Sequence, residues 1–344
     1  MKTSEFEEQV ILACRRDHKS PKTEEDYSRW TRRFGRWLQG RTELHASTSE
    51  IKVSSFLSWL ATRPKGCACK TQHQALCALV FAYGKGRGMP LGEMPAWVKP
   101  PERKRLPVWL STAEFTALER HLDGPCLELA QLMFGCGLRL NEGLRLRVKD
   151  LDFDAGLILV RSGKGDKDRP TKFPEMLKPV LRDRLSRLHD LWLSDRAADV
   201  PGVHLPDDVG RKFPRYGMDW PWQWVFPAKG LSFDKRSGIT RRHHLHEDTL
   251  AKSLKRAAVN SRLSKRITVH TLRHSFATAF LVNGGNIHDL KELLGHRHLE
   301  TTEIYTHCIP QFASRMVSPL DVRPNVVPFH IPDESQSSIQ RRHA

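Results

Sequence analysis

Apolar residues in the first hundred positions recur at the spacing of one face of a helix. Between Thr23 and Leu60 they are Tyr27, Trp30, Phe34, Trp37 and Leu38, followed by Val53, Phe56, Leu57 and Leu60. A further helical stretch covers Thr71 to Tyr83, and the alternating pattern of a strand is scarce before residue 100. The pattern predicts a small all-helical domain over residues 1–100, with a loosely held tail at its N-terminus.

The stretch from Lys99 to Pro107 is basic, broken by prolines and without periodicity. These features are typical of a linker, which we place at residues 101–110. Its central cations, Arg103, Lys104 and Arg105, are suited to follow a phosphate backbone. The sequence therefore predicts a domain boundary here.

Residues 111–321 carry the pattern of a second, mostly helical domain with a small sheet. Ser111 followed by Glu114 predicts a capping box at a helix start. Residues 151–161 are rich in Leu, Ile and Val, and residues 162–167 have the composition of a hairpin tip. We expect amphipathic helices at 250–263, 271–282 and 287–294, and a flexible tail at 322–344. The expected fold class is mainly α with a small antiparallel β-sheet (α+β).

Residues 190–246 interrupt the helical pattern with prolines, glycines and the segment Trp220-Pro221-Trp222-Gln223-Trp224. No simple periodic element fits this stretch, so we predict an insertion within the second domain. Its aromatic side chains either form a small core of their own or are displayed to a partner. The sequence leaves both possibilities open.

The chain of 344 residues has 56 basic and 39 acidic side chains, a formal net charge of +17. Such an excess predicts a partner with many negative charges, with nucleic acid first and an anionic membrane surface second. No apolar run approaches the roughly 20 residues that span a bilayer. The N-terminus, with Glu5, Glu7 and Glu8, also lacks the pattern of a secretory signal. We therefore expect a soluble, intracellular protein without a membrane partner.

Seven cysteines are present, and Cys67 and Cys69 are too close in sequence for an ordinary zinc or thioredoxin motif. Free thiols in a reducing compartment are the expectation. Basic residues interleave with the apolar positions of the first domain: Arg29, Arg32, Arg33, Arg36 and Lys70. They form either a solvated helix face or a DNA-contacting one, and the total charge favours DNA contact.

The second domain carries the residue types that break a phosphodiester bond without a metal: a nucleophile, cations for the non-bridging oxygens and an acid for the leaving group. Arg139 follows a glycine turn, and Arg273 lies in His270-Thr271-Leu272-Arg273-His274. Both can make forked contacts with phosphate. Because His270 lies three residues before Arg273, the two side chains can aim at one point at a helix start.

Lys164, between two glycines at the hairpin tip, is a candidate general acid, with Lys167 as the competing one. Gly295 ends a helix and presents His296, and Tyr305 follows nine residues later as a candidate nucleophile. Each residue has another interpretation: Arg139 as the partner of Glu142, the histidines as core or cap residues, and Tyr305 as a half-buried aromatic. Their joint order favours a catalytic set.

That order resembles the tyrosine recombinase (lambda integrase-like) family, over residues 106–310 and more loosely before them. The motifs are Gly137-Leu138-Arg139-Leu140-Asn141-Glu142, His270-Thr271-Leu272-Arg273-His274-Ser275-Phe276-Ala277-Thr278, and Leu294-Gly295-His296 with Tyr305-Thr306-His307. The resemblance implies a helical, SAM-like DNA-binding domain followed by a catalytic domain. It also implies a tetramer on two DNA sites, with residues 309–320 docking on a neighbouring protomer, in the bacterial cytoplasm at the nucleoid.

The roles implied by this resemblance fall on the same residues. Arg139 and Arg273 clamp the phosphate, and Lys164 is the general acid. His270 and His296 assist, and Tyr305 attacks to give a 3′-phosphotyrosyl link and a free 5′-hydroxyl. Because the link conserves the bond energy, the resemblance implies neither ATP nor any other cofactor, and no metal.

Within the family the chain most resembles an integron integrase. The resemblance uses residues 146–153 and above all the inserted segments at 205–207, 211–214, 220–227 and 241–244. It implies capture and excision of gene cassettes by joining a duplex attachment site to a folded single-stranded cassette site. The candidates for reading unpaired bases and nearby phosphates are Trp220, Trp222, Trp224, Arg241, Arg242 and His243. A chromosome-dimer resolvase or phage-type integrase is the alternative.

Two other function classes remain. A non-catalytic DNA-binding regulator would use residues 286–307 as a helix-turn-helix, but it leaves Arg139, Lys164 and Arg273 without a role. A metal-dependent nuclease would lose activity in chelator. The neighbouring His243, His244 and His246 do not have the spacing of a metal site, so none is predicted.

Overall fold

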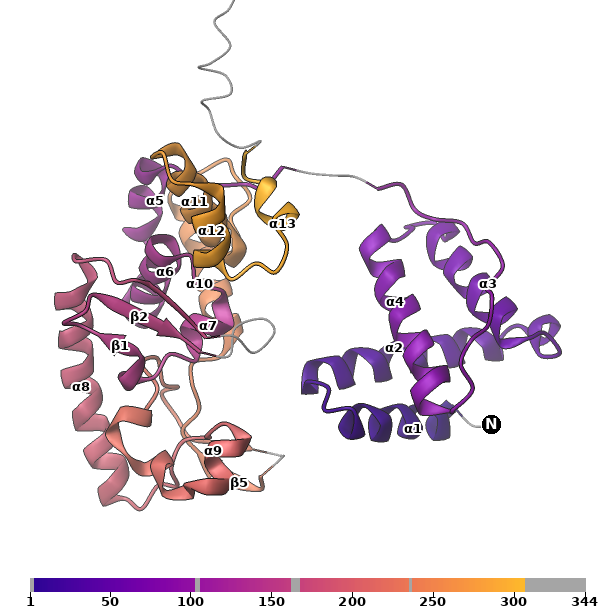
Figure 1. Ribbon diagram of the computed structural model, residues 1–344, viewed down its shortest axis with the longest axis horizontal. Coiled ribbons are helices and arrows are strands. Elements are labelled where there is room, and N and C mark those ends of the chain that lie inside the picture. The colour runs from indigo at the N-terminus through magenta and orange to yellow at the C-terminus, as the bar shows by residue number, and fades with distance from the viewer. Residues whose placement is uncertain (1–2, 103–105, 162–167, 235–236, 307–344) are drawn as a thin grey trace, which may run out of the picture. The chain divides into compact units, whose positions relative to one another are not determined.

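The computed structural model describes residues 3–102, 106–161, 168–234 and 237–306, and the chain divides into two compact units, Met1–Arg105 and Leu106–Ala344 (Figure 1). Several predicted positions lie outside the described residues: Arg103, Lys104, Arg105, Lys164, Lys167 and residues 309–320. Within the described residues, no helix is long and apolar enough to cross a membrane. The described cysteines, Cys14, Cys67, Cys69, Cys77, Cys126 and Cys136, are free thiols.

The first unit is helical. Its helices are α1 (Thr3–Arg16), α2 (Pro21–Gln39), α3 (Ser49–Thr62) and α4 (Cys69–Phe81), with a 3-10 turn at Thr42–Leu44 and a π-helical turn at Ala82–Gly86. The Ser20 hydroxyl accepts a hydrogen bond from the Thr23 backbone N–H at the start of α2, and Thr48 caps α3 through Ile51. These caps satisfy N–H groups that a helix start leaves open.

An aromatic cluster forms the core of this unit. Phe34 packs edge-on against Phe56, with ring centroids 5.3 Å apart, and Trp37 packs on the same ring at 5.2 Å. The apolar positions that predicted the helices of this unit are mostly buried in this core: Trp30, Phe34, Trp37, Val53, Phe56, Leu57 and Leu60.

The prediction of a loosely held N-terminal tail was wrong. Residues 3–16 form α1, which packs on α2. Phe6, Val10 and Cys14, spaced four residues apart, are buried in the aromatic core, and the Arg15 guanidinium donates to Glu24 at 3.0 Å. Ala13 is buried as well, so α1 has an amphipathic face, but the exposed Leu12 and the intervening charged residues obscured its periodicity in the sequence.

The second unit contains a small antiparallel sheet among helices. Its elements are α5 (Thr112–Glu119), α6 (Gly124–Cys136), α7 (Leu140–Leu144), β1 (Leu151–Asp152), β2 (Leu157–Val160), β3 (Arg169–Lys172), α8 (Leu177–Ala197), α9 (Asp207–Lys212), β4 (Ser232–Asp234), β5 (Ile239–Arg241), α10 (Glu247–Asn260), α11 (Val269–Val282), α12 (Ile287–Leu294) and α13 (Glu300–Glu303). The strand order is β1-β2-β3, with Ile158 opposite Thr171, and β4 pairs with β5. The predicted fold class, mainly α with a small antiparallel sheet, is confirmed.

Several elements of this unit agree with the sequence-based predictions. Ser111 and Glu114 form the predicted capping box at the start of α5. The predicted helix at residues 287–294 is α12, and the one at 271–282 is α11, which begins two residues earlier. α11 packs on α6 and α12, and α12 packs on β3, so residues from three parts of the sequence meet in one place (Figure 1).

Part of the stretch 190–246 belongs to the core of the second unit. Trp224, Val225 and Phe226 are buried, and the Val225 N–H donates to the Leu146 carbonyl at 2.9 Å. The buried Arg147 guanidinium lies 3.9 Å from the Trp224 ring centroid and donates to the carbonyls of Trp222 and His204. Trp224 is therefore a structural residue, and its prediction as a base-contacting side chain was wrong.

Candidate active site

A sharp turn between α6 and α7 positions Arg139. Gly137 ends α6 in the left-handed region, with φ of 65°, and a Cβ there would lie 2.4 Å from the Phe276 ring. Arg139 then precedes α7, and its backbone N–H donates to Glu142 Oε2 at 2.8 Å. Its guanidinium donates to Glu142 Oε1 at 2.7 Å and to the Gly295 carbonyl at 3.0 Å. The Arg139–Glu142 pair foreseen as an alternative is formed.

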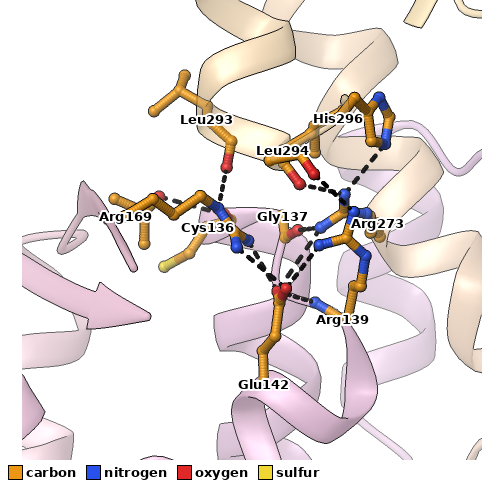
Figure 2. A network of polar contacts seen from close by, with 11 residues as sticks. Cys136, Gly137, Arg139, Glu142, Arg169, Arg273, Leu293, Leu294 and His296 are labelled. Atoms are coloured by element: carbon orange, nitrogen blue, oxygen red, sulfur yellow. Dashed lines mark hydrogen bonds and ion pairs between the residues drawn. The ribbon is translucent and has the colours of Figure 1, made fainter. Parts of the chain in front are cut away.

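The buried Glu142 carboxylate is the shared acceptor of this cluster. Arg169, on β3, donates Nη1 to Oε1 at 3.0 Å and Nη2 to Oε2 at 2.7 Å. Arg273 Nη1 lies 3.8 Å from Oε2 (Figure 2). Burial alone raises the pKa of the Glu142 carboxyl, but the hydrogen bonds and charge of Arg169, with Arg139, lower it to about 2. Three guanidinium groups thus face one carboxylate, and positive charge remains in excess.

Arg273 is held by backbone carbonyls. Its Nη1 donates to the Gly137 carbonyl at 2.5 Å and its Nη2 to the Leu294 carbonyl at 2.6 Å, so one side chain ties the end of α6 to the end of α12. Burial, followed by the charge of Arg139, lowers the pKa of the Arg273 guanidinium to about 9. An anion in this place would relieve the repulsion between the two arginines.

His296 follows the left-handed Gly295 that ends α12. Its Nε2 lies 3.1 Å from Arg273 Nη2, and its Nδ1 lies 2.9 Å from the Thr302 hydroxyl oxygen. Because a guanidinium can only donate, Nε2 is the acceptor in this contact and Nδ1 carries the proton in the neutral ring. Thr302 thereby fixes the orientation of the imidazole beside Arg273.

Tyr305 lies just after α13 and is only 2% exposed. Its ring packs with Leu281, Leu290 and Leu294 and lies parallel to the His296 ring, with centroids 6.5 Å apart. Its hydroxyl oxygen lies 2.9 Å from Nδ1 of His274. The His270 ring is 6.4 Å from the His274 ring on the same helix. The structure therefore brings together Arg139, Arg273, His296 and Tyr305, whereas His270 is exposed and lies one helical turn before His274.

Sequence reasoning missed three contributors to this cluster. Arg169 gave no signal, because its partner Glu142 lies 27 residues away. Thr302 is an ordinary polar residue of a short helix. His274 stands within the quoted motif, but nothing in the spacing indicated that it contacts Tyr305.

The predicted DNA-contacting residues of the first unit lie in different surroundings. Arg32 pairs with Glu7 of α1. The Arg33 guanidinium lies 5.0 Å from the Trp30 ring centroid and 5.8 Å from that of Trp59. Lys70, near the start of α4, is exposed. These cations lie at the surface or on aromatic faces.

The residues of the inserted stretch that were predicted to contact DNA also have different surroundings from one another. Trp222 stacks on Tyr216 at 5.9 Å, and Trp220 packs on His189 at 5.0 Å and on Trp192 at 5.8 Å. The Arg242 guanidinium is held by Asp195 at 2.5 Å. These residues and His243 are partly exposed.

Arg241 contacts the Gly202 carbonyl at 3.4 Å. In the described part of the chain, His243, His244 and His246 belong to no group of three or more potential ligands that could hold a metal ion.

Comparison with known proteins assigns the chain to a family. The model of the phage integrase family matches residues 115–311, and that of the phage integrase N-terminal SAM-like domain matches residues 6–93. The chain is 45% identical over 307 residues to an "Integrase/recombinase" of Escherichia coli and to one of Pseudomonas aeruginosa, covering 89% of this chain and 90% of each relative. It is 32% identical to "Tyrosine recombinase XerA" of Thermococcus onnurineus, covering 84% of this chain and 85% of that one.

Solved structures share the fold. A XerH site-specific recombinase bound to a palindromic difH substrate has a TM-score of 0.61 at 20% identity, covering 93% of this chain and 85% of that one. The Tn1549 transposon integrase with transposon right end DNA has a TM-score of 0.58 at 16% identity, covering 91% and 99%. The family model spans more than half of the 344 residues, and the relatives match most of the length. The chain therefore belongs to the phage integrase family of tyrosine recombinases and is a site-specific recombinase.

Proposed function

We propose that the chain cleaves and rejoins DNA through a covalent link between Tyr305 and the 3′ end of the cut strand. Arg139 and Arg273 clamp the scissile phosphate, and His270 and His296 assist as hydrogen-bonding and proton-transfer groups. Lys164, outside the described residues, protonates the leaving 5′ oxygen. The observation that carries this proposal is the convergence of Arg139, Arg273, His296 and Tyr305 from separate elements.

The electrostatics of the cluster fit phosphate. Two fixed guanidiniums present donors from a largely dry environment, where hydrogen bonds to a developing charge are strong, and His296 Nε2 accepts from one of them. Glu142 neutralises one positive charge and leaves the others to an anion. Donors fixed in place before the substrate arrives need no reorganisation as charge builds on the phosphoryl oxygens.

The chemistry proceeds in two exchanges. The Tyr305 oxygen attacks phosphorus, the bond to the 5′ oxygen breaks, and an acid supplies the proton of the new 5′-hydroxyl. A 5′-hydroxyl of another strand then attacks the phosphotyrosyl bond and releases the phenol. Each exchange makes one phosphate ester bond and breaks another, so no ATP is needed.

The proposed substrates are an integron attachment duplex and a folded single-stranded cassette site. The inserted stretch supports this with an aromatic stack: Phe213 lies 4.9 Å from Tyr216, which lies 5.9 Å from Trp222. Lys149 Nζ lies 2.9 Å from the Trp222 ring centroid, which places a cation beside the stack. Phe213 is 50% exposed, so an unpaired base has an aromatic face to stack on.

A chromosome-dimer resolvase or phage-type integrase is the second candidate, favoured by the 32% identity to XerA. In either case we expect a homotetramer on two DNA sites in the bacterial cytoplasm, at the nucleoid. Residues 309–320 are the proposed docking segment between protomers.

The test uses labelled DNA in chelator without added metal. One probe is a folded single-stranded cassette-type site, and the other is a plain duplex. We expect a covalent protein–DNA adduct that Tyr305→Phe abolishes, with more adduct on the folded strand. Equal adduct on both probes would argue for the resolvase or phage-type alternative. DNA binding without adduct on any site, including duplexes selected from a random pool, would contradict the enzymatic proposal and favour a regulator.

A further inference from the structure

His274 makes a direct contact with the proposed nucleophile. Its Nδ1 lies 2.9 Å from the Tyr305 hydroxyl oxygen, and the two ring centroids are 5.5 Å apart. His274 is on α11, directly after Arg273, whereas Tyr305 follows α13. The same helix therefore carries a phosphate-clamping arginine and, at the next position, the group that contacts the phenol.

The surroundings of His274 keep its imidazole neutral. Burial, then the nearby His270 and Arg273 on α11, lower the pKa of His274 to about 4. A neutral imidazole with its proton on Nε2 presents an acceptor lone pair at Nδ1. The Tyr305 hydroxyl can then donate to His274, which leaves the phenolic oxygen lone pairs for attack.

The other histidine beside Tyr305 is oriented for a different task. His296 contacts Thr302 through Nδ1 and Arg273 through Nε2, so its ring nitrogens face the polar cluster. Its contact with Tyr305 is a parallel stacking of the two rings. The two histidines thus divide between the phosphate and the nucleophile.

We propose that His274 Nδ1 accepts the hydroxyl proton of Tyr305 as the phenolic oxygen attacks phosphorus. In this step the bond from oxygen to phosphorus forms, the bond from phosphorus to the 5′ oxygen breaks, and the phenolic proton moves to His274. The proton that the leaving oxygen receives comes separately from the general acid. This inference rests on the proposed function of Tyr305 as nucleophile.

Substrate binding strengthens the acceptor. A DNA phosphate held by Arg139 and Arg273 brings negative charge next to the positive charge that disfavours the imidazolium form of His274. The phosphate therefore raises the basicity of His274 when the phenol is to attack. In the absence of DNA, the neutral ring only holds the hydroxyl.

The substrate is a duplex that the wild-type protein selects from a pool with a random central segment, with adduct formation as the criterion. The test then measures the rate of single-turnover adduct formation on this duplex. We expect His274→Ala to slow adduct formation by about 100-fold, as loss of a general base does, with DNA binding unchanged. His288→Ala, an exposed histidine at the start of α12, is the matched control and should cleave as wild type does. Thermal melting checks the fold of each variant.

Two further measurements separate proton acceptance from orientation. His274→Asn keeps a neutral acceptor near the position of Nδ1, and we expect it to remain slow because an amide does not take up a proton. A substrate with sulfur in place of the bridging 5′ oxygen has a leaving group that needs no proton. We expect it not to restore His274→Ala, and added imidazole to restore that variant in part.

A wild-type rate in His274→Ala or in His274→Asn would overturn the inference, and so would restoration of His274→Ala by the sulfur-bridged DNA. Failure of the wild-type protein to form an adduct on any DNA is a different result, which would contradict the proposed function itself.

Discussion

Arg273 and Glu142 lie 3.8 Å apart between guanidinium Nη1 and carboxylate Oε2, but Arg273 donates its hydrogen bonds to the Gly137 and Leu294 carbonyls. Glu142 is bound instead by Arg139 and Arg169. Arg273 is therefore rigidly placed without a full neutralising partner, which is consistent with its proposed contact with phosphate.

Replacing Arg273 by Lys keeps a positive charge but loses the forked geometry that joins two carbonyls and His296. We expect adduct formation to fall by about 100- to 1,000-fold, the usual effect of losing a placed transition-state donor. The measurement is single-turnover cleavage of a selected duplex. A Lys variant as fast as wild type would show that charge alone suffices.

Arg169 positions Glu142 and also donates to the Leu293 carbonyl at 2.8 Å. Arg169→Ala should remove two hydrogen bonds from the buried Glu142 carboxylate and the hydrogen bond to the Leu293 carbonyl near the end of α12. We expect cleavage to slow by about tenfold or more and unfolding to become easier by about 3 kcal/mol. Urea unfolding and single-turnover cleavage check this, with the exposed Arg120→Ala as control. Loss of DNA binding with normal stability would argue for direct DNA contact instead.

The folded-state pKa of Glu142, about 2, lies below its ordinary value of 4.5. Because the pKa is lower in the folded state, the ionised carboxyl contributes fully to the free energy of unfolding at pH values above about 4.5. This contribution is lost as the pH falls from about 4.5 to 2. The difference corresponds to about 3 kcal/mol. We expect a steeper loss of unfolding free energy over this window in wild type than in Glu142→Gln. Parallel curves for the two proteins would refute the assignment.

Trp222 and Trp224 should respond differently to truncation. Trp222→Ala removes a partly exposed ring from the aromatic stack, and we expect weaker binding of the folded single-stranded site by about 1–3 kcal/mol, with duplex binding kept. Trp224→Ala empties a core position and should instead destabilise the second unit by about 3–5 kcal/mol. Equal loss of both DNA forms in Trp222→Ala would remove the support for base reading.

The general acid is expected to be Lys164, with Lys167 as the alternative. Lys164→Ala should cleave ordinary DNA at least about 100-fold more slowly and recover on DNA with a bridging sulfur, because a thiolate leaves without a proton. Recovery of Lys167→Ala alone would assign the acid to that residue.

Helical periodicity is a local property, so the amino-acid pattern alone predicted helices such as α2 and α12. It also singled out Arg139, His270, Arg273, His296 and Tyr305 as candidate catalytic residues, because they stand in motifs that can be read without knowing their contacts. In α1 the intervening charged residues obscured the same periodicity, and only packing against α2 revealed the helix.

Which side chains share a partner depends on the tertiary packing. Glu142 joins Arg139 with Arg169, and His274 contacts Tyr305 across 31 residues of sequence. That packing also places Trp224 in the core, although Trp222, two residues earlier, is partly exposed. Such contacts depend on how α6, α11, α12 and the sheet pack together. The residues next to a side chain in the sequence do not specify that packing.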